Sequence, residues 1–259
     1  MLGTALVRTP GPRLAEGIVT HVERRPVDVG RARAQHAAYT TALARNGWRP
    51  REVDPADDCP DAVFVEDALI VVDDVAVLTR PGARSRRGEV AGAEAAATAL
   101  GLTVARIEGP ATLDGGDVLQ VGRTVYVGRA GAQARTDAGG VRALRRILEP
   151  LGRTVVPVAL TGALHLKSAV TALPDGTLLG VPRFLDTTAL PTLRVPPEDD
   201  GAHVVPLGGG TVLLSAAAPR TAEWLDDLGF DVVTVDIGEF EKLEGCVTCL
   251  SVLCPTLAG

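Results

Sequence analysis

The sequence predicts an α/β fold built from five related units that close into a ring. A helical stretch, a short strand, a loop and two apolar runs around a polar turn recur in that order. Repeats of this size usually mean that each unit buries a face against its neighbour. Polar side chains also gather at one recurrent point, the loop that leads into each pair of apolar runs. An ordinary α/β domain in which helices and strands merely alternate is the alternative.

The expected helices cover residues 31–46, 85–100, 137–151 and 219–228. A glycine follows each of them, at Gly47, Gly101, Gly152 and Gly229. Glycine ends a helix at little cost because it adopts the left-handed backbone conformation easily. A short strand is expected next in each case ("WRPREV", "LTVARI", "RTVVPV" and "FDVVTVDI").

Paired apolar runs then predict hairpins, with turns at "VDD", "VGR", "PDG" and "GGG". A fourth, less regular unit covers about residues 183–216, and the run "GCVTCLSVLC" is expected to end the chain as a strand. No stretch rich in Ser, Gly or Pro is long enough to separate domains, so we expect a single domain over residues 1–259.

Composition excludes several classes of protein. Hydrophobic residues make up 46% and charged residues 22%, which fits a globular chain with an aliphatic core. The net charge of −6 makes nucleic acid an unexpected partner. No apolar run reaches the roughly 18 residues of a membrane span, and "MLGTALVRTPGPR" lacks a signal-peptide layout. We therefore expect a cytoplasmic protein that does not bind membranes, whose cysteines stay reduced.

The polar residues of the recurrent loops lie at matching distances from the preceding glycine. The pairs are Gly47–Asp67 and Gly229–Cys249, 20 residues apart, and Gly101–Asp114 and Gly152–His165, 13 residues apart. Units related by rotation would aim these four side chains at the same end of the axis. Functional groups commonly sit on such scaffolded loops.

Three of the four cysteines fall within "EGCVTCLSVLC" at 244–254. Cys246 and Cys249 have the spacing of a thioredoxin-like redox pair. Such a pair usually opens a helix, and a zinc site needs four ligands, so both remain minor alternatives. Strand alternation would place Cys246 and Cys249 on opposite faces, which argues against their pairing. Cys59 and Cys254 read as buried small hydrophobes.

Two acidic stretches accompany the cysteine. "PDAVFVED" at 60–67 alternates like a strand, and "TLDGGDV" at 112–118 places two aspartates around a Gly-Gly turn that lets backbone approach a ligand. Each alone could be a turn or a solvated edge. Together they predict an acidic pocket that raises the pKa of a nearby thiol. Such a pocket suits a cationic substrate, and a guanidinium fits because it is planar and pairs with carboxylates.

The motifs "FVED", "TRPGARSRR", "LDGGDV", "HLKS" and "TCLSVL", in this order over residues 61–254, resemble the dimethylarginine dimethylaminohydrolase family of the guanidino-group-modifying (pentein) superfamily. The resemblance implies a five-bladed α/β propeller, a pseudo-fivefold repeat of ββαβ units in one catalytic domain. It also implies hydrolysis of asymmetric dimethylarginine or monomethylarginine to citrulline, without a metal or organic cofactor. Arginine deiminase, another guanidino-group hydrolase and a non-catalytic propeller binding protein are the alternatives. A homodimer is left open.

Roles follow from the resemblance, residue by residue. Cys249 is the expected nucleophile, His165 the general acid/base, and Asp114 the acid that orients the histidine and contacts the guanidinium. Substrate contacts are expected from Asp61, Glu66, Asp67, Arg86, Arg135 and Leu243, with the two arginines on the substrate carboxylate. The segment "GRAGAQARTD" carries about three more residues before Arg135 than the family pattern.

Overall fold

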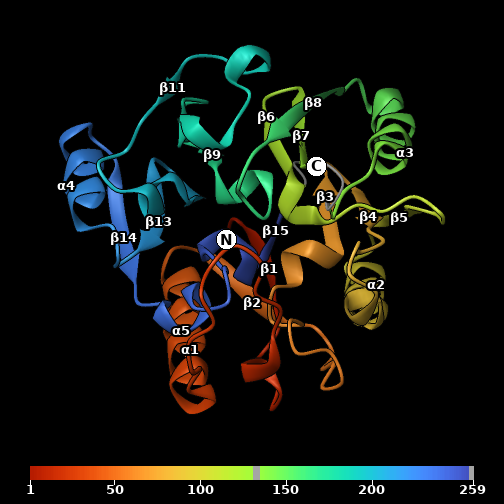
Figure 1. Ribbon diagram of the computed structural model, residues 1–259, viewed down its shortest axis with the longest axis horizontal. Helices are drawn as coiled ribbons and strands as arrows, with labels where there is room; N and C mark the ends of the chain where they lie inside the picture. Colours follow the sequence, from red (N-terminus) through yellow and green to blue (C-terminus); the bar gives the residue numbers. More distant parts are fainter. Residues whose placement is uncertain (131–134, 257–259) are drawn as a thin grey trace.

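Five three-stranded sheets surround a central axis in the part of the chain that the computed structural model describes, residues 1–130 and 135–256. The expected five-bladed α/β propeller is therefore confirmed. The helices α1–α4 lie at the periphery, and β1 and β15 lie near the centre (Figure 1). The extra residues expected before Arg135 fall at 131–134, outside the described residues.

Three blades follow the ββαβ pattern fully. Each has an antiparallel hairpin, a helix and a third strand parallel to the second. Their elements are β3 Leu69–Val72, β4 Val75–Leu78, α2 Val90–Ala99 and β5 Thr103–Arg106; β6 Val118–Val121, β7 Thr124–Ala130, α3 Ala138–Leu148 and β8 Thr154–Leu160; and β12 Val204–Gly208, β13 Thr211–Ser215, α4 Pro219–Asp227 and β14 Asp231–Val235.

The fourth blade is reduced, and it covers residues 170–194, whereas the sequence placed the less regular unit at about 183–216. It consists of β9 Val170–Ala172, β10 Leu178–Gly180 and β11 Leu193–Arg194, and short 3-10 turns replace the helix between its last two strands.

The remaining blade closes the ring with both ends of the chain. β15 Val252–Pro255 pairs antiparallel with β1 Gly3–Val7, and β1 pairs parallel with β2 Trp48–Glu52 after α1 Val29–Arg45. A short helix, α5 Gly238–Glu241, packs beside α1. Sequence patterning missed β1, although it anticipated that the last unit would end near the first.

Glycines end the helices as predicted. Gly47 and Gly229 have φ of 86° and 89°, conformations that residues with a Cβ rarely adopt. The chain can therefore reverse direction at the end of α1 and α4 without strain.

A 3-10 turn precedes the inner strand of every blade. These turns are η2 Val65–Ala68, η4 Gly115–Asp117, η6 Leu166–Ser168, η9 Asp199–Ala202 and η10 Val247–Leu250. The strand expected over 60–67 is therefore wrong, and the one expected over 245–254 is confirmed only from Val252 onward, because strand structure begins at Leu69 and Val252. Close to the axis no partner strand is available, and a 3-10 turn pairs backbone N–H groups with carbonyls three residues back.

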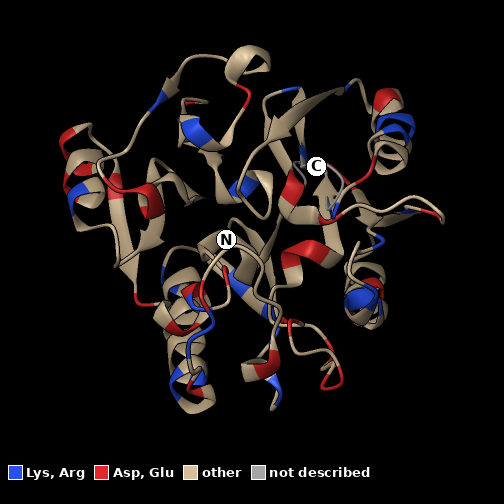
Figure 2. Cartoon of the chain, viewed as in Figure 1, with Lys and Arg blue, Asp and Glu red and all other residues tan. Residues whose placement is uncertain are grey.

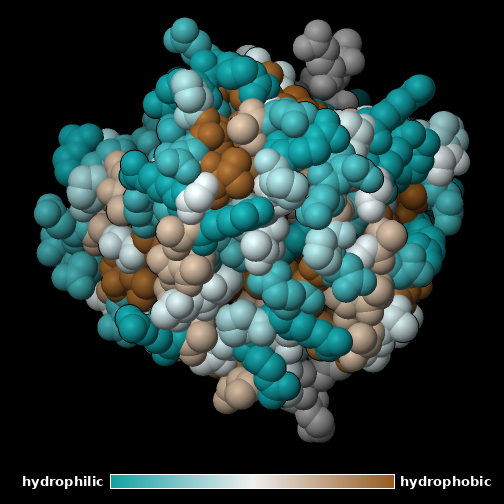
Figure 3. Space-filling model, turned by 90° about the horizontal axis from the view of Figure 1, so that it is seen from below, coloured by the Kyte–Doolittle hydropathy of each residue, from teal (hydrophilic) through white to brown (hydrophobic). Residues whose placement is uncertain are grey.

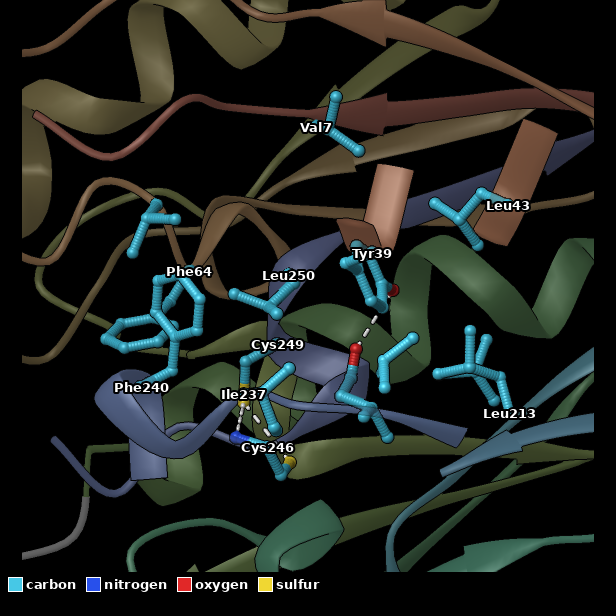
Figure 4. Packing of buried hydrophobic residues seen from close by; sticks show 14 of the residues in the cluster. Val7, Tyr39, Leu43, Phe64, Leu213, Ile237, Phe240, Cys246, Cys249 and Leu250 are labelled. Carbon is cyan, nitrogen blue, oxygen red and sulfur yellow. Dashed lines mark hydrogen bonds between the residues drawn. The ribbon is translucent and has the colours of Figure 1, made fainter. Parts of the chain in front are cut away.

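The core lies between the blades and is mainly aliphatic. The cluster between the first and last blades also holds Tyr39, Phe64 and Phe240, and the two phenylalanine rings meet edge to face at 6.3 Å (Figure 4). Hydrophilic residues cover much of one face of the molecule, with small hydrophobic patches between them (Figure 3). Among the described residues, no helix combines the length and the apolar character needed to cross a membrane.

Tyr39 ties α1 to the turn η10. Its buried hydroxyl donates to the carbonyl oxygen of Val247 at 3.0 Å (Figure 4). It also lies 2.7 Å from the hydroxyl of Ser251. Two elements more than 200 residues apart in sequence are thus fixed by one side chain.

Replacing Tyr39→Phe should lower the free energy of unfolding by about 1–3 kcal/mol, because the buried Val247 carbonyl and Ser251 hydroxyl each lose a hydrogen-bond partner. Urea denaturation monitored by circular dichroism measures this change. The matched control is Tyr126→Phe, which should cost less than about 0.5 kcal/mol because its hydroxyl has no hydrogen bond to a described residue. Equal losses in the two variants would contradict the proposed anchoring role.

Candidate active site

Four of the 3-10 turns converge at one end of the axis. Turn η2 contacts both η4 and η10, and η4 contacts η6. Asp114 and His165 directly precede η4 and η6, whereas Asp67 and Cys249 are the third residues of η2 and η10. The repeated 13- and 20-residue offsets in the sequence are explained by these two equivalent positions. Figure 2 shows acidic segments near the centre and charges of both signs on the outer helices.

A small cavity of about 20 Å³ lies where the turns meet. Its lining residues are Ile18, Asp61, Phe64, Asp67, Arg86, Arg135, Leu164, His165, Leu243, Glu244, Gly245 and Cys249. All predicted site residues except Asp114 and Glu66 therefore line one cavity, and Asp114 lies directly beneath it against His165.

His165 is held between two carboxylates from neighbouring blades. Its Nε2 lies 3.2 Å from Oδ2 of Asp114, and its Nδ1 lies 3.8 Å from Oδ1 of Asp67. Burial alone would lower the pKa of His165, but Asp67, Asp114 and Asp117 outweigh it and raise the pKa to about 9. The imidazole is therefore protonated at neutral pH.

Asp67 is itself fixed by an arginine. The Arg86 guanidinium donates one Nη1–H to Oδ2 of Asp67. Its Nε and Nη2 donate to Oε1 and Oε2 of Glu89 at 2.9 and 2.8 Å. Oδ1 of Asp67 accepts from the backbone N–H of Gly116 at 2.8 Å. Burial would raise the pKa of Asp67, but His165, Arg86 and the Gly116 N–H together lower it. Asp67 is thus a carboxylate throughout the physiological range.

Arg86 also donates from Nη2 to two backbone carbonyl oxygens, those of Asp61 and Phe64. These contacts account for four of the five guanidinium N–H groups and leave one on Nη1. The contact with a substrate carboxylate that the sequence predicts for Arg86 would therefore use this remaining Nη1–H. Its main role in the ligand-free site is to position Asp67.

Sequence reasoning missed a buried network beneath Asp114. Thr136 accepts from the backbone N–H of Asp114 at 3.1 Å and donates to Oδ2 of Asp117 at 2.6 Å. Oδ1 of Asp117 accepts from the backbone N–H of Leu166, next to His165, at 3.0 Å. One carboxylate therefore holds both residues of the His165–Asp114 pair in place. The second aspartate of "LDGGDV", Asp117, is the feature of the sequence that could have indicated this network.

The Gly-Gly pair of "LDGGDV" makes room for protein groups. A Cβ at Gly115 would lie 1.9 Å from the carbonyl oxygen of Glu66. A Cβ at Gly116 would lie 2.7 Å from both Oδ1 of Asp67 and Nδ1 of His165. The close approach that the sequence suggested for a ligand is, in the ligand-free site, an approach between neighbouring blades.

The cysteine pair corrects the expected geometry. Cys246 and Cys249 were expected on opposite faces of a strand, but η10 brings their sulfur atoms to 3.3 Å (Figure 4). The backbone N–H of Cys246 also points at Sγ of Cys249, at 3.4 Å. The reason is the backbone: in a 3-10 turn, residues three apart lie on the same side.

The pKa of Cys249 is raised, which was the expected direction. Its first cause is the hydrogen bond to Cys246, followed by burial, and the carboxylates of Glu66 and Asp67 contribute less. The acidic surroundings emphasised by the sequence are therefore a secondary cause. The raised pKa keeps the candidate nucleophile Cys249 in its thiol form at neutral pH.

Glu66 lies apart from this cavity. Its carboxylate pairs with Lys167 at 2.6 Å and accepts from the Thr248 hydroxyl at 3.0 Å. It faces a separate cavity of about 220 Å³, walled by the inner strands β3, β6, β9, β12 and β15. Burial, partly offset by Lys167, raises the pKa of Glu66 to about 8. This geometry favours a role in closing the axis over direct substrate contact.

The other predicted contacts sit at the cavity wall. Asp61 accepts from the backbone N–H of Ile18 at 2.9 Å, and burial raises its pKa. Arg135 extends toward Asp114, with 3.9 Å between Nη1 and Oδ2. Leu243 is buried and lines the cavity two residues before the Gly245 bend.

Asp67, Asp114 and His165 are also the described residues that could hold a metal ion, since their ligand atoms lie within 4.8 Å of one another. The Arg86 guanidinium occupies one oxygen of Asp67, and the backbone N–H of Gly82 occupies one oxygen of Asp114. These contacts leave few free lone pairs for a metal ion, and a protonated imidazole is not a metal ligand, so the three residues fit a metal site poorly.

Comparison with known proteins gives a consistent result, although no family model matches the chain. It is 61% identical over 249 residues to the dimethylarginine dimethylaminohydrolase of Streptomyces coelicolor, covering 96% of this chain and 95% of that protein. It superimposes with a TM-score of 0.91 on a dimethylarginine dimethylaminohydrolase adduct with S-methyl-L-thiocitrulline, at 33% identity and with 98% and 100% of the chains covered.

A third relative is a cysteine-to-serine mutant of the Pseudomonas aeruginosa dimethylarginine dimethylaminohydrolase, complexed with citrulline. Its TM-score is 0.89 at 33% identity, with 98% of this chain and 100% of that chain covered. The similarity to all three therefore extends over the full set of blades.

Replacing Asp67→Asn should lower the pKa of His165 from about 9, because it removes the first charge that raises it. Proton NMR titration of the imidazole measures the midpoint. The control Asp61→Asn changes a carboxyl of the same cavity that does not contact His165, and should leave the midpoint near 9. An unchanged midpoint in Asp67→Asn would contradict the description of this contact.

Proposed function

The chain belongs to the dimethylarginine dimethylaminohydrolase family and is a dimethylargininase, and we propose that it works through a covalent intermediate on Cys249. The overall reaction adds water to an N-omega-methylated arginine and yields citrulline and methylamine or dimethylamine. The family resemblance of the motifs is thereby confirmed. The role of each residue is our proposal.

The substrate guanidinium binds between Asp67 and Asp114, above His165. Both carboxylates are buried, so a planar cation that donates to them gains more than it would in water. The cavity of about 20 Å³ holds little more than one water, so its walls must separate on binding. The amino-acid end extends toward Arg135 and the remaining Nη1 hydrogen of Arg86. Asp61 and the Leu243 backbone face the same space.

The incoming cation favours the ionised form of Cys249 by charge pairing. The thiolate attacks the guanidinium carbon, a C–S bond forms, and the adduct is tetrahedral. His165 donates its proton to the methylated nitrogen, the C–N bond breaks, and the amine leaves behind an S-alkylthiouronium group. The now neutral His165 takes a proton from water, which attacks the same carbon. The C–S bond then breaks and releases citrulline and the thiolate.

One observation carries this proposal. Asp67, His165 and Cys249 come from turns of three different blades, yet they line a single cavity, with Asp114 bonded to His165 from a fourth. A raised pKa near 9 makes His165 the acid that the first step requires. The steps use no metal or organic cofactor.

A cytoplasmic location remains part of the proposal. The four cysteines, Cys59, Cys246, Cys249 and Cys254, are free thiols, which fits a reducing compartment. A nucleophilic thiol also needs such a compartment to stay reduced.

Replacing Cys249→Ser should lower kcat by at least about 10³-fold, because an alkoxide nucleophile is far harder to form than a thiolate. Citrulline binding, measured by calorimetry, should persist, since the carboxylates and arginines are untouched. The control Cys254→Ser changes a buried thiol of β15 outside the cavity and should keep most activity. Substantial turnover by Cys249→Ser would overturn the covalent mechanism.

Substrate choice is tested by comparing kcat/KM for asymmetric dimethylarginine, monomethylarginine and unmethylated arginine in one assay. Family membership predicts that both methylated substrates are preferred over arginine. Ammonia release from arginine at a higher kcat/KM would instead favour arginine deiminase.

A further inference from the structure

Cys246 has no role in the proposed reaction, yet it touches the nucleophile. The two sulfur atoms lie 3.3 Å apart, with Cys249 in the turn η10 and Cys246 directly before it (Figure 4). A disulfide bond has a sulfur–sulfur length of about 2.0 Å, so closure needs an approach of only about 1.3 Å.

The two sulfur atoms face different cavities. Cys249 lines the small cavity with Asp67 and His165. Cys246 lines a second one of about 240 Å³, on the other side of Gly245. The exposed residues His21, Val22 and Asp200 also line this second cavity, so it reaches the surface. A small molecule can therefore approach Cys246 without entering the substrate cavity.

The surroundings favour ionisation of Cys246 over Cys249. The hydrogen-bonded contact between the two thiols lowers the pKa of Cys246 well below the ordinary value of a thiol and raises that of Cys249. His203 adds to the effect. The thiolate is the form of cysteine that reacts with oxidants.

We propose that Cys246 is a modification site for small hydroperoxides, and that its oxidation captures Cys249 in a reversible intramolecular disulfide. The proposal goes beyond the hydrolase reaction. It rests on the proposed function only where it states that turnover stops when Cys249 is captured.

The chemistry balances with one hydroperoxide as oxidant. The Cys246 thiolate attacks one oxygen of hydrogen peroxide, the O–O bond breaks, and Cys246 sulfenic acid and hydroxide form. The sulfur of Cys249 then attacks the sulfenic sulfur, the S–O bond breaks, and the disulfide and water form. Two thiols have lost two electrons, and the peroxide has become two waters. A dithiol reductant reverses the modification by thiol–disulfide exchange.

The other two cysteines are poor candidates for this reaction. The thiol of Cys254 donates to the carbonyl oxygen of Val252, and the sulfur of Cys59 lies beside Gly88. Neither has another sulfur among the contacts of the described residues. Burial raises the pKa of Cys254 to about 12, and burial also raises the pKa of Cys59.

The test treats the full-length, ligand-free enzyme with a small molar excess of hydrogen peroxide and removes the excess with catalase. Alkylatable cysteines should fall from four to two, and the peptide that contains residues 246–249 should lose two hydrogens in mass spectrometry. Activity should fall in parallel and return after dithiothreitol. These mass readouts do not depend on turnover, so they remain interpretable if the hydrolase proposal fails.

The discriminating variant is Cys246→Ser, with Cys59→Ser as the matched control. Relative to its own untreated activity, Cys246→Ser should lose activity roughly tenfold more slowly than wild type, because the reactive thiolate is gone. Its losses should not be reversed by dithiothreitol. Cys59→Ser should behave like wild type and fall from three alkylatable thiols to one.

Two results would overturn the proposal. One is inactivation of the wild type with oxygen atoms added to Cys249 and no loss of two hydrogens. The other is equal, dithiothreitol-reversible inactivation of Cys246→Ser and wild type. If Cys246→Ser proves unstable, Cys246→Ala serves in the same comparison, and the peptide mass of wild type decides alone.

Discussion

A protonated imidazole between two buried carboxylates is the contact on which the site depends. Asp67 and Asp114 reach His165 from two neighbouring blades, and each is anchored by further groups behind it. Gly115 and Gly116 allow this approach, because any Cβ there would overlap the partners. The same geometry that packs the blades at the axis therefore sets the charge of His165, the proposed proton carrier. Stability and chemistry share one set of contacts.

Burial also determines at which carboxylate a cationic substrate gains the most electrostatic stabilisation. An uncompensated buried charge costs several kcal/mol, so most acids near the axis carry a cation of their own. Arg86 neutralises Asp67 and Glu89, and Lys167 neutralises Glu66. Asp114 has the imidazole and a guanidinium at 3.9 Å, and Asp61 has one backbone donor. A guanidinium arriving beside Asp114 therefore supplies charge that the protein itself provides only weakly.

Much of this arrangement follows from the sequence. Helix ends at glycine, hairpin turns and matched offsets predicted the propeller, and brought Asp67, His165 and Cys249 to one place. Alternation failed at 60–67 and at 246–251, because these segments lie at the axis and pair within themselves in 3-10 turns. That error hid the contact between Cys246 and Cys249. Glu66 and Arg86 line different cavities, and which cavity each one lines depends on contacts with neighbouring blades. The local sequence pattern does not contain this information.

The central claim is that Cys249 stays a thiol in the ligand-free site and ionises when a cation arrives. Carbon-13 labelling of the cysteine Cβ atoms reports this directly, since the chemical shift of Cys249 differs between thiol and thiolate. At neutral pH we expect a thiol signal without ligand and with neutral citrulline, and a thiolate signal with a cationic arginine analogue that is not hydrolysed. A thiolate signal in the ligand-free enzyme would contradict the account.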